Sequence, residues 1–138
     1  MNIQETLNKA VKILNKSNIK NSYLDSEILL SKTINKDRKY IILNSQEQLS
    51  KKSLKNFSNL IKRRKKSEPI AYLINKKEFW NHTFYIDCNV LIPRPDTEIL
   101  VEETLKLFSK SSKLRILDIG TGSGCILLSI LKERRNFL

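Results

Sequence analysis

Three glycines, the only ones in the chain, stand at alternate positions: Gly120, Gly122 and Gly124. A short apolar run, residues 114–119, precedes them, and residues with helical spacing follow from Ile126. Such a run is typical of a strand buried in a parallel sheet. Glycine lets the backbone turn sharply and approach a ligand without a clash from a Cβ atom. We therefore predict a strand, a turn and a helix, with a nucleotide-type cofactor bound at the turn.

The spacing of this turn separates it from two common cofactor sites. It is not Gly-x-Gly-x-x-Gly, which disfavours a dinucleotide, and it lacks the Lys-Ser/Thr of a P-loop. The acid-x-Gly-x-Gly-x-Gly pattern resembles motif I of class I methyltransferases. That resemblance implies an S-adenosylmethionine site in which the acid helps to hold the cofactor's amino group and the loop lies beside its methionine part. The implied cofactor-binding residues here are Asp118, Gly120, Thr121, Gly122, Ser123 and Gly124.

The first 66 residues have helical periodicity. Ile3, Leu7, Val11 and Leu14 mark one face of a predicted first helix. Residues 40–43 suit a short helix or a buried turn.

A second helix is predicted to begin after Ser22, which can act as its cap because Asp25 stands three residues later. Its buried stripe is predicted to contain Leu24, Ile28 and Leu29.

Another helix is predicted to begin after Ser50, because Leu49 and Leu54 occupy the positions of a hydrophobic staple around this cap. The helix ends in the basic run Lys62–Lys66, where cations favour the helix dipole. Pro69 disfavours helix at Glu68 and closes the helical part.

Strand-forming residues come next. Residues 79–80 and 83–86 are predicted to form a hairpin around an Asn81-His82 turn, so that His82 is a turn residue rather than a catalytic one. An extended Pro-Arg-Pro stretch follows at 93–95, and Asp96 is predicted to cap the next helix.

Charge is unevenly distributed. Residues 1–75 hold 16 Lys/Arg against 6 Asp/Glu, whereas residues 76–138 hold 10 against 8. The basic front half favours an acidic partner, either RNA or a protein face, although an AT-rich genome would produce the same bias in residue usage. Cys88 and Cys125 lack Cys-x-x-Cys spacing and are predicted to be buried, reduced thiols, and one histidine offers no zinc cluster. Without a signal peptide or a long apolar segment, the chain is predicted to be cytoplasmic.

The stretch before the loop makes the resemblance more specific. In order, the chain contains Arg63-Arg64, Glu68-Pro69-Ile70-Ala71-Tyr72, Glu78-Phe79-Trp80, and Val90-Leu91-Ile92-Pro93-Arg94-Pro95-Asp96-Thr97-Glu98. Together with motif I these residues resemble the HemK/PrmC family, the N5-glutamine methyltransferases of peptide chain release factors. Residues 23–30 are also similar to the second helix of that family.

The resemblance implies three parts: a helical release-factor-binding domain at 1–75, a β-hairpin linker at 76–95, and the first part of a class I Rossmann-like α/β methyltransferase domain at 96–138. It implies S-adenosylmethionine as cofactor and the Gly-Gly-Gln glutamine of class-1 release factors as substrate, in translation termination. Arg94 and Thr97 become further candidates for contacting the cofactor, with Asp96 and Glu98 beside them.

The family's catalytic Asn-Pro-Pro-Tyr motif is absent from these 138 residues, whose only prolines are Pro69, Pro93 and Pro95. We therefore expect a truncated or split member of the family that is inactive alone, with no catalytic residue of its own. Two alternatives remain open at this point: a basic helical module that binds RNA or the ribosome, and an N-methyltransferase that acts on a nucleic-acid base.

Overall fold

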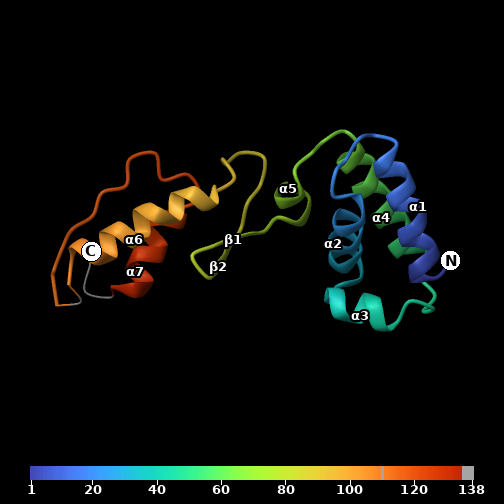
Figure 1. Cartoon of the computed structure of the whole chain (residues 1–138), viewed down its shortest axis with the longest axis horizontal. Helices are drawn as coiled ribbons and strands as arrows, with labels where there is room; N and C mark the ends of the chain where they lie inside the picture. The colour runs from blue at the N-terminus through green and yellow to red at the C-terminus, as the bar shows by residue number, and fades with distance from the viewer. Residues whose placement is uncertain (110, 135–138) are drawn as a thin grey trace. The chain divides into compact units, whose positions relative to one another are not determined.

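The computed structural model describes residues 1–109 and 111–134, and the chain divides into two compact units, Met1–Ile74 and Asn75–Leu138 (Figure 1). We call them the helical unit and the second unit. Each is described by itself. No helix among the described residues is both long and apolar enough to cross a membrane.

The helical unit contains five helices: α1 (Ile3–Asn15), α2 (Ser22–Ile34), α3 (Arg38–Leu43), α4 (Lys51–Lys65) and α5 (Ile70–Ile74). Helices α1, α2 and α4 pack on one another, and α3 and α5 pack against α2. Their shared core consists of apolar side chains from all five helices, together with Ile19: Ile3, Leu7, Ala10, Leu14, Ile19, Leu29, Leu30, Ile41, Phe57, Ile61 and Leu73. The predicted helical front half is therefore confirmed, while α5 is a helix that periodicity did not indicate.

Side chains at the helix starts set where three of these helices begin. Ser50 caps α4 by accepting a hydrogen bond from the Ser53 amide at 3.0 Å, as predicted. Asn2 and Glu5 form a capping box at the start of α1, and Asp37 caps α3. Each such cap satisfies backbone N–H groups that the helix leaves without partners, and is typically worth about 1 kcal/mol.

Helix α2 departs from the prediction in its cap and in its buried face. Ser22 is the first helical residue and donates its hydroxyl to Asn15, while Asn21 holds the cap position without a side-chain bond. Leu24 is 39% exposed, and the buried leucines are Leu29 and Leu30. The predicted stripe is therefore right at Leu29 and wrong at Leu24, because the rest of the buried face consists of two serines and two acidic residues, Ser22, Asp25, Ser26 and Glu27.

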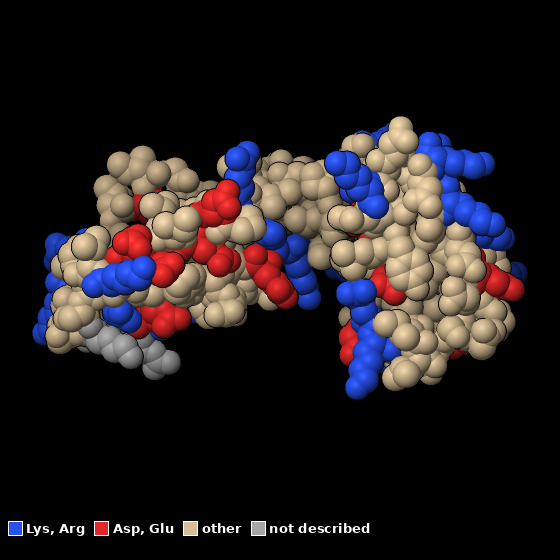
Figure 2. Space-filling view, in the orientation of Figure 1, with Lys and Arg blue, Asp and Glu red and all other residues tan. Residues whose placement is uncertain are grey.

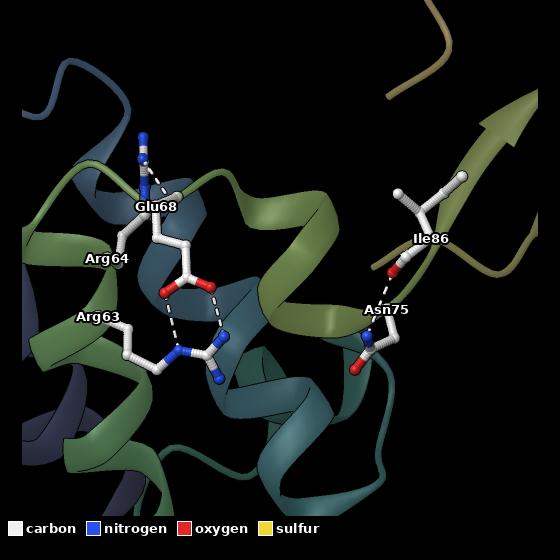
Figure 3. A network of polar contacts seen from close by, with 5 residues as sticks. All are labelled: Arg63, Arg64, Glu68, Asn75 and Ile86. Atoms are coloured by element: carbon white, nitrogen blue, oxygen red, sulfur yellow. Dashed lines mark hydrogen bonds and ion pairs between the residues drawn. The ribbon is translucent and has the colours of Figure 1, made fainter. Parts of the chain in front are cut away.

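Two carboxylates on that inward face are paired with arginines from other elements. Asp25 Oδ2 lies 2.7 Å from Arg64 Nε of α4, and Glu27, whose side chain is 2% exposed, accepts two hydrogen bonds from Arg38. Arg64 also donates from Nη1 to the Glu68 carbonyl at 3.0 Å (Figure 3). Pairing with hydrogen-bonded cations lets charged groups remain ionised out of water.

A third ion pair at the end of α4 makes stability depend weakly on pH. The Arg63 guanidinium, hydrogen-bonded to Glu68, lowers the pKa of that carboxyl below its ordinary value of 4.5. Because the folded pKa lies below the unfolded one, the pair stabilises the fold above the ordinary pKa, and this contribution is lost as the pH falls through the folded pKa.

We expect Glu68→Gln to destabilise the helical unit slightly at about pH 7, and progressively less as the pH falls through the lowered pKa of Glu68. The effect is small because the Arg63 and Glu68 side chains are 52% and 27% exposed. Urea unfolding of both proteins across this range measures it, and a difference that grows toward acid would contradict the assigned sign.

The second unit opens with a two-stranded antiparallel hairpin, β1 (Lys77–Phe79) and β2 (His82–Phe84). The predicted hairpin is confirmed, but its turn is Trp80-Asn81 and not Asn81-His82, since Phe79 pairs with His82. Both turn residues have positive φ, 48° and 57°, as a two-residue turn of this twist requires. Asn75 closes the base of the hairpin by donating its side-chain N–H to the Ile86 carbonyl at 3.2 Å (Figure 3).

The 3-10 turn η1 (Pro95–Thr97) leads into α6 (Glu98–Leu107), and α7 (Cys125–Glu133) follows the glycines. Asp96 lies inside η1 and makes no cap, so that prediction was wrong. Cys125 is buried as predicted, but Cys88 is exposed because it lies in the loop after the hairpin. No group of acidic, His and Cys side chains able to hold a metal ion occurs within residues 1–109 and 111–134.

Candidate cofactor site

The glycine turn has the backbone geometry that its sequence predicts. Gly120, Gly122 and Gly124 have φ values of 80°, 55° and 74°, all in the left-handed region. An L-residue with a Cβ atom is strained there by roughly 1–2 kcal/mol. The local backbone therefore favours glycine at all three positions, and their alternate spacing follows from a loop that enters this region three times.

Gly124 joins the turn to α7. Its amide donates to the Thr121 carbonyl at 2.8 Å, and its own carbonyl accepts from the Leu128 amide at 2.9 Å, so it occupies the N-cap position. A Cβ atom at Gly124 would lie 3.2 Å from Leu128 Cδ1, whereas one at Gly120 would meet nothing within 4 Å. The backbone at Gly120 is thus open to an approaching group, which is what a ligand-binding turn needs.

Asp118, at the entry to the turn, is half-buried, and its Oδ2 atom is buried without a hydrogen-bond partner among the described residues. The Ser123 hydroxyl within the turn is in the same state. Burying a polar atom without a hydrogen-bond partner costs free energy, and a bound group that forms the missing hydrogen bond removes that cost. A bound molecule with hydrogen-bond donors near Asp118 would do so.

Arg94 and Thr97 are not joined to the glycine turn by side-chain hydrogen bonds among the described residues. Arg94 is exposed at the N-cap of η1, and Thr97 is half-buried with its amide donating to the Arg94 carbonyl at 3.1 Å. Within the described part of the chain, neither side chain forms a hydrogen bond or ion pair with the turn. The contact of their segment with the turn is made by Val90, because a Cβ at Gly122 would lie 3.7 Å from Val90 Cγ2. Because Val90 is apolar, nothing in the sequence marked it as a residue of the site.

Residues 114–119 precede the turn but form no hydrogen-bonded strand. Their burial alternates: Leu114, Ile116 and Asp118 are half-buried, while Leu117 and Ile119 are 83% and 88% exposed. The segment thus has the two-residue period of a strand with apolar side chains on both faces, as expected of a strand covered on both sides. The predicted strand is therefore seen only in this alternation of burial, because no described segment pairs with residues 114–119 in a sheet.

A hollow of about 500 Å³ lies between this segment and helices α6 and α7. Its walls are largely apolar and come from Leu100, Thr104, Phe108, residues 114–118, Ile126, Leu127 and Ile130. Asp118 is the acidic group on its lining. The second unit therefore presents an open apolar hollow that reaches Asp118, at the entry to the turn.

Comparisons with known proteins give the family. Residues 5–74 match the profile of the PrmC N-terminal domain. The release factor glutamine methyltransferase of Buchnera aphidicola subsp. Schizaphis graminum is 47% identical over 130 residues, which cover 94% of this chain and 46% of the relative. The enzyme of the same name from Clostridium acetobutylicum is 42% identical over 136 residues, covering 99% and 48%. A bifunctional methyltransferase of Rickettsia felis is 39% identical over 161 residues, covering 97% and 31%.

The chain spans about half the length of the first two of these curated relatives. The family profile covers the helical unit from Glu5, the third residue of α1, to Ile74. The similarity to the relatives extends further and takes in the hairpin and the glycine turn. This chain therefore belongs to the PrmC N-terminal domain family.

Proposed function

We propose that this chain acts in the S-adenosylmethionine-dependent N5-methylation of the glutamine in the Gly-Gly-Gln motif of class-1 peptide chain release factors. Relatives that are 42–47% identical over nearly the whole chain carry the name release factor glutamine methyltransferase. In this proposal the helical unit contacts the release factor, and the second unit supplies the first part of a Rossmann-like methyltransferase domain. The division of residues 76–138 into a linker and a domain start belongs to the same proposal.

The observation that carries the proposal is the turn from Asp118 to Gly124. The buried, unpartnered Asp118 oxygen fits a cationic amino group, which would satisfy it with a charge-assisted hydrogen bond. The open space at Gly120 fits close approach of a ligand to the backbone. S-adenosylmethionine carries such an amino group and, when bound, supplies an electrophilic methyl group. Asp118 would hold the amino group, with Thr121 and Ser123 on the turn beside it and Arg94 and Thr97 as further candidates.

The ion pairs of the helical unit weaken the rival proposal of an RNA-binding module. That alternative rests on the positive charge of residues 1–75, which includes the basic run Lys62–Lys66. Arg63 and Arg64, however, are engaged by Glu68 and Asp25. Part of the basic run therefore holds the helical unit together.

A chimeric enzyme tests the proposal. Residues 1–134 replace the matching part of the Buchnera aphidicola relative, and methyl transfer is measured on a release factor with an intact Gly-Gly-Gln motif and on one with Gln replaced by Ala. We expect transfer only to the first. We expect Asp118→Ala to weaken S-adenosylmethionine binding by about tenfold or more, as loss of a charged hydrogen bond of about 1.5–3 kcal/mol would.

The matched control is Glu102→Ala, which removes an exposed carboxylate from α6 in the same unit. Its cofactor affinity should equal that of the unmodified chimera. Equal affinity in the Asp118 and Glu102 variants would remove Asp118 from the site. Methylation of nucleic acid in place of the release factor would refute the proposed substrate.

A further inference from the structure

An apolar groove lies on the helical unit between α1 and α4. We call it the α1–α4 groove. Its volume is about 220 Å³, and its apolar lining comes from Ala10 and Ile13 of α1 and from Leu54, Phe57 and Ile61 of α4. Ile13 is 43% exposed, whereas Ala10, Phe57 and Ile61 are buried at the floor. The groove is therefore an open, apolar surface feature built by two neighbouring helices.

Lysines follow the groove along both helices. Lys9 of α1 lines the groove, and Lys12 and the C-cap residue Lys16 follow it with i+3 and i+7 spacing, on the same side of the helix. On α4, Lys51, Lys55, Lys62 and Lys65 are spaced i, i+4, i+11 and i+14 and also share one side. All seven lysines are exposed, and none forms an ion pair with another described residue. Figure 2 shows basic side chains along the edge of the helical unit where α1 lies.

Negative charge is nearly missing from these two helices. Helix α4 has no Asp or Glu, and Glu5 is the only acidic residue of α1. The Glu5 carboxylate accepts the Asn2 amide at 3.1 Å in the capping box. The two rows of lysines therefore have almost no counter-charges on their own helices. Between the rows lies the apolar floor of the groove.

We propose that the α1–α4 groove is the docking site for an acidic amphipathic helix of a partner protein. A helix with apolar residues at i, i+3, i+4 and i+7 lays its apolar face into a groove of this kind. Carboxylates on either side of that stripe meet the lysines of α1 and α4, and the match of charge fixes orientation and speeds association.

The chemistry of the groove selects a protein partner over a nucleic acid. A phosphate backbone would pair with the lysines but would leave the apolar floor unfilled. Single-stranded nucleic acids also bind through bases stacked on accessible aromatic rings, and Phe57, the aromatic residue of the groove, is 3% exposed. The inference does not rest on the proposed methyl transfer, because the groove and its charges belong to the helical unit alone.

The test uses the full chain and a fluorescein-labelled synthetic helix with Leu at i, i+3, i+4 and i+7 and Glu at the flanking positions. One comparison peptide has the same composition with its leucines dispersed, and another has Lys in place of Glu. We expect only the first peptide to bind, with NMR amide shifts that gather at Thr6, Ala10, Ile13, Ser58 and Ile61. Its affinity should fall as salt rises from about 0.05 to 0.5 M.

Variants locate the site. Ile13→Glu and Ser58→Glu each place a carboxylate at an exposed lining position, and each is expected to weaken peptide binding by about tenfold or more. Ile42→Glu is the matched control, because Ile42 is 60% exposed on α3 and does not line the groove. Amide spectra confirm that each variant is folded. Equal binding of the dispersed peptide, unchanged affinity in both groove variants, or displacement of the peptide by a uridine oligonucleotide would overturn the proposal.

Discussion

Replacement of Arg64 by methionine is expected to lower the free energy of unfolding of the helical unit by about 3–5 kcal/mol. Arg64 Nε lies 2.7 Å from Asp25 Oδ2, and the two side chains are only 18% and 8% exposed. Methionine keeps much of the side-chain volume but leaves the Asp25 carboxylate buried without its counter-charge. It also removes the hydrogen bond to the Glu68 carbonyl. The loss therefore comes mainly from an uncompensated buried charge.

Native-state hydrogen exchange at the amides of Leu14, Leu29 and Ile61 measures this change, because these buried residues report on the helical unit alone. Arg63→Met is the matched control, since its ion pair with Glu68 is far more exposed and is expected to contribute less than about 1 kcal/mol. The double variant Asp25→Leu/Arg64→Met should regain most of the stability, because both charges are gone. A loss below about 1 kcal/mol in the single Arg64 variant would show that water already screens Asp25.

These ion pairs also explain where sequence reasoning succeeded in the helical unit and where it did not. Helices α1 and α4 were predictable because each has a cap or an apolar face whose signal lies within a few residues, such as Ser50 beside Leu49. In α2 the inward positions include Asp25 and Glu27, which periodicity assigns to the surface. Their arginine partners belong to α3 and α4, so the sequence of α2 alone does not indicate them.

The hairpin turn shifted by one residue for a similar reason. Asn81-His82 looked like the polar pair of a turn, but the structure places Trp80 in the turn with positive φ. The Trp80 amide donates to the Glu98 carboxylate at 2.9 Å, a contact 18 residues along the chain. The local preference of these turns for Asn and Gly is weak compared with the total stability of a protein. A long-range hydrogen bond such as this one can therefore place Trp80 in the turn.

The glycine turn was predictable because its requirement is local. Left-handed φ at three alternate residues favours glycine at each of them. Contact of Arg94 or Thr97 with a cofactor stays a prediction, since it depends on how the segment around Val90 packs against the turn. The backbone of the turn can therefore be derived from sequence, whereas the side chains that lie beside it depend on the packing of segments distant in the sequence.

Leu30→Ala and Leu24→Ala distinguish the observed face of α2 from the one that periodicity indicated. Leu30 is 0% exposed in the core shared with α1 and α4, so its truncation is expected to remove about 2–5 kcal/mol through lost burial and a remaining cavity. Leu24, which the periodicity placed in the buried stripe, is 39% exposed and should lose less than about 1 kcal/mol.

Hydrogen exchange or urea unfolding of the two variants gives both values under the same conditions. The substitution is identical in chemistry and in helix propensity, and both sites lie on the same helix, so the difference between them isolates burial. A larger loss at Leu24 than at Leu30 would mean that α2 is rotated about its axis relative to this structure. That rotation would also withdraw Asp25 and Glu27 from their arginines, so the result would count against the Arg64 prediction as well.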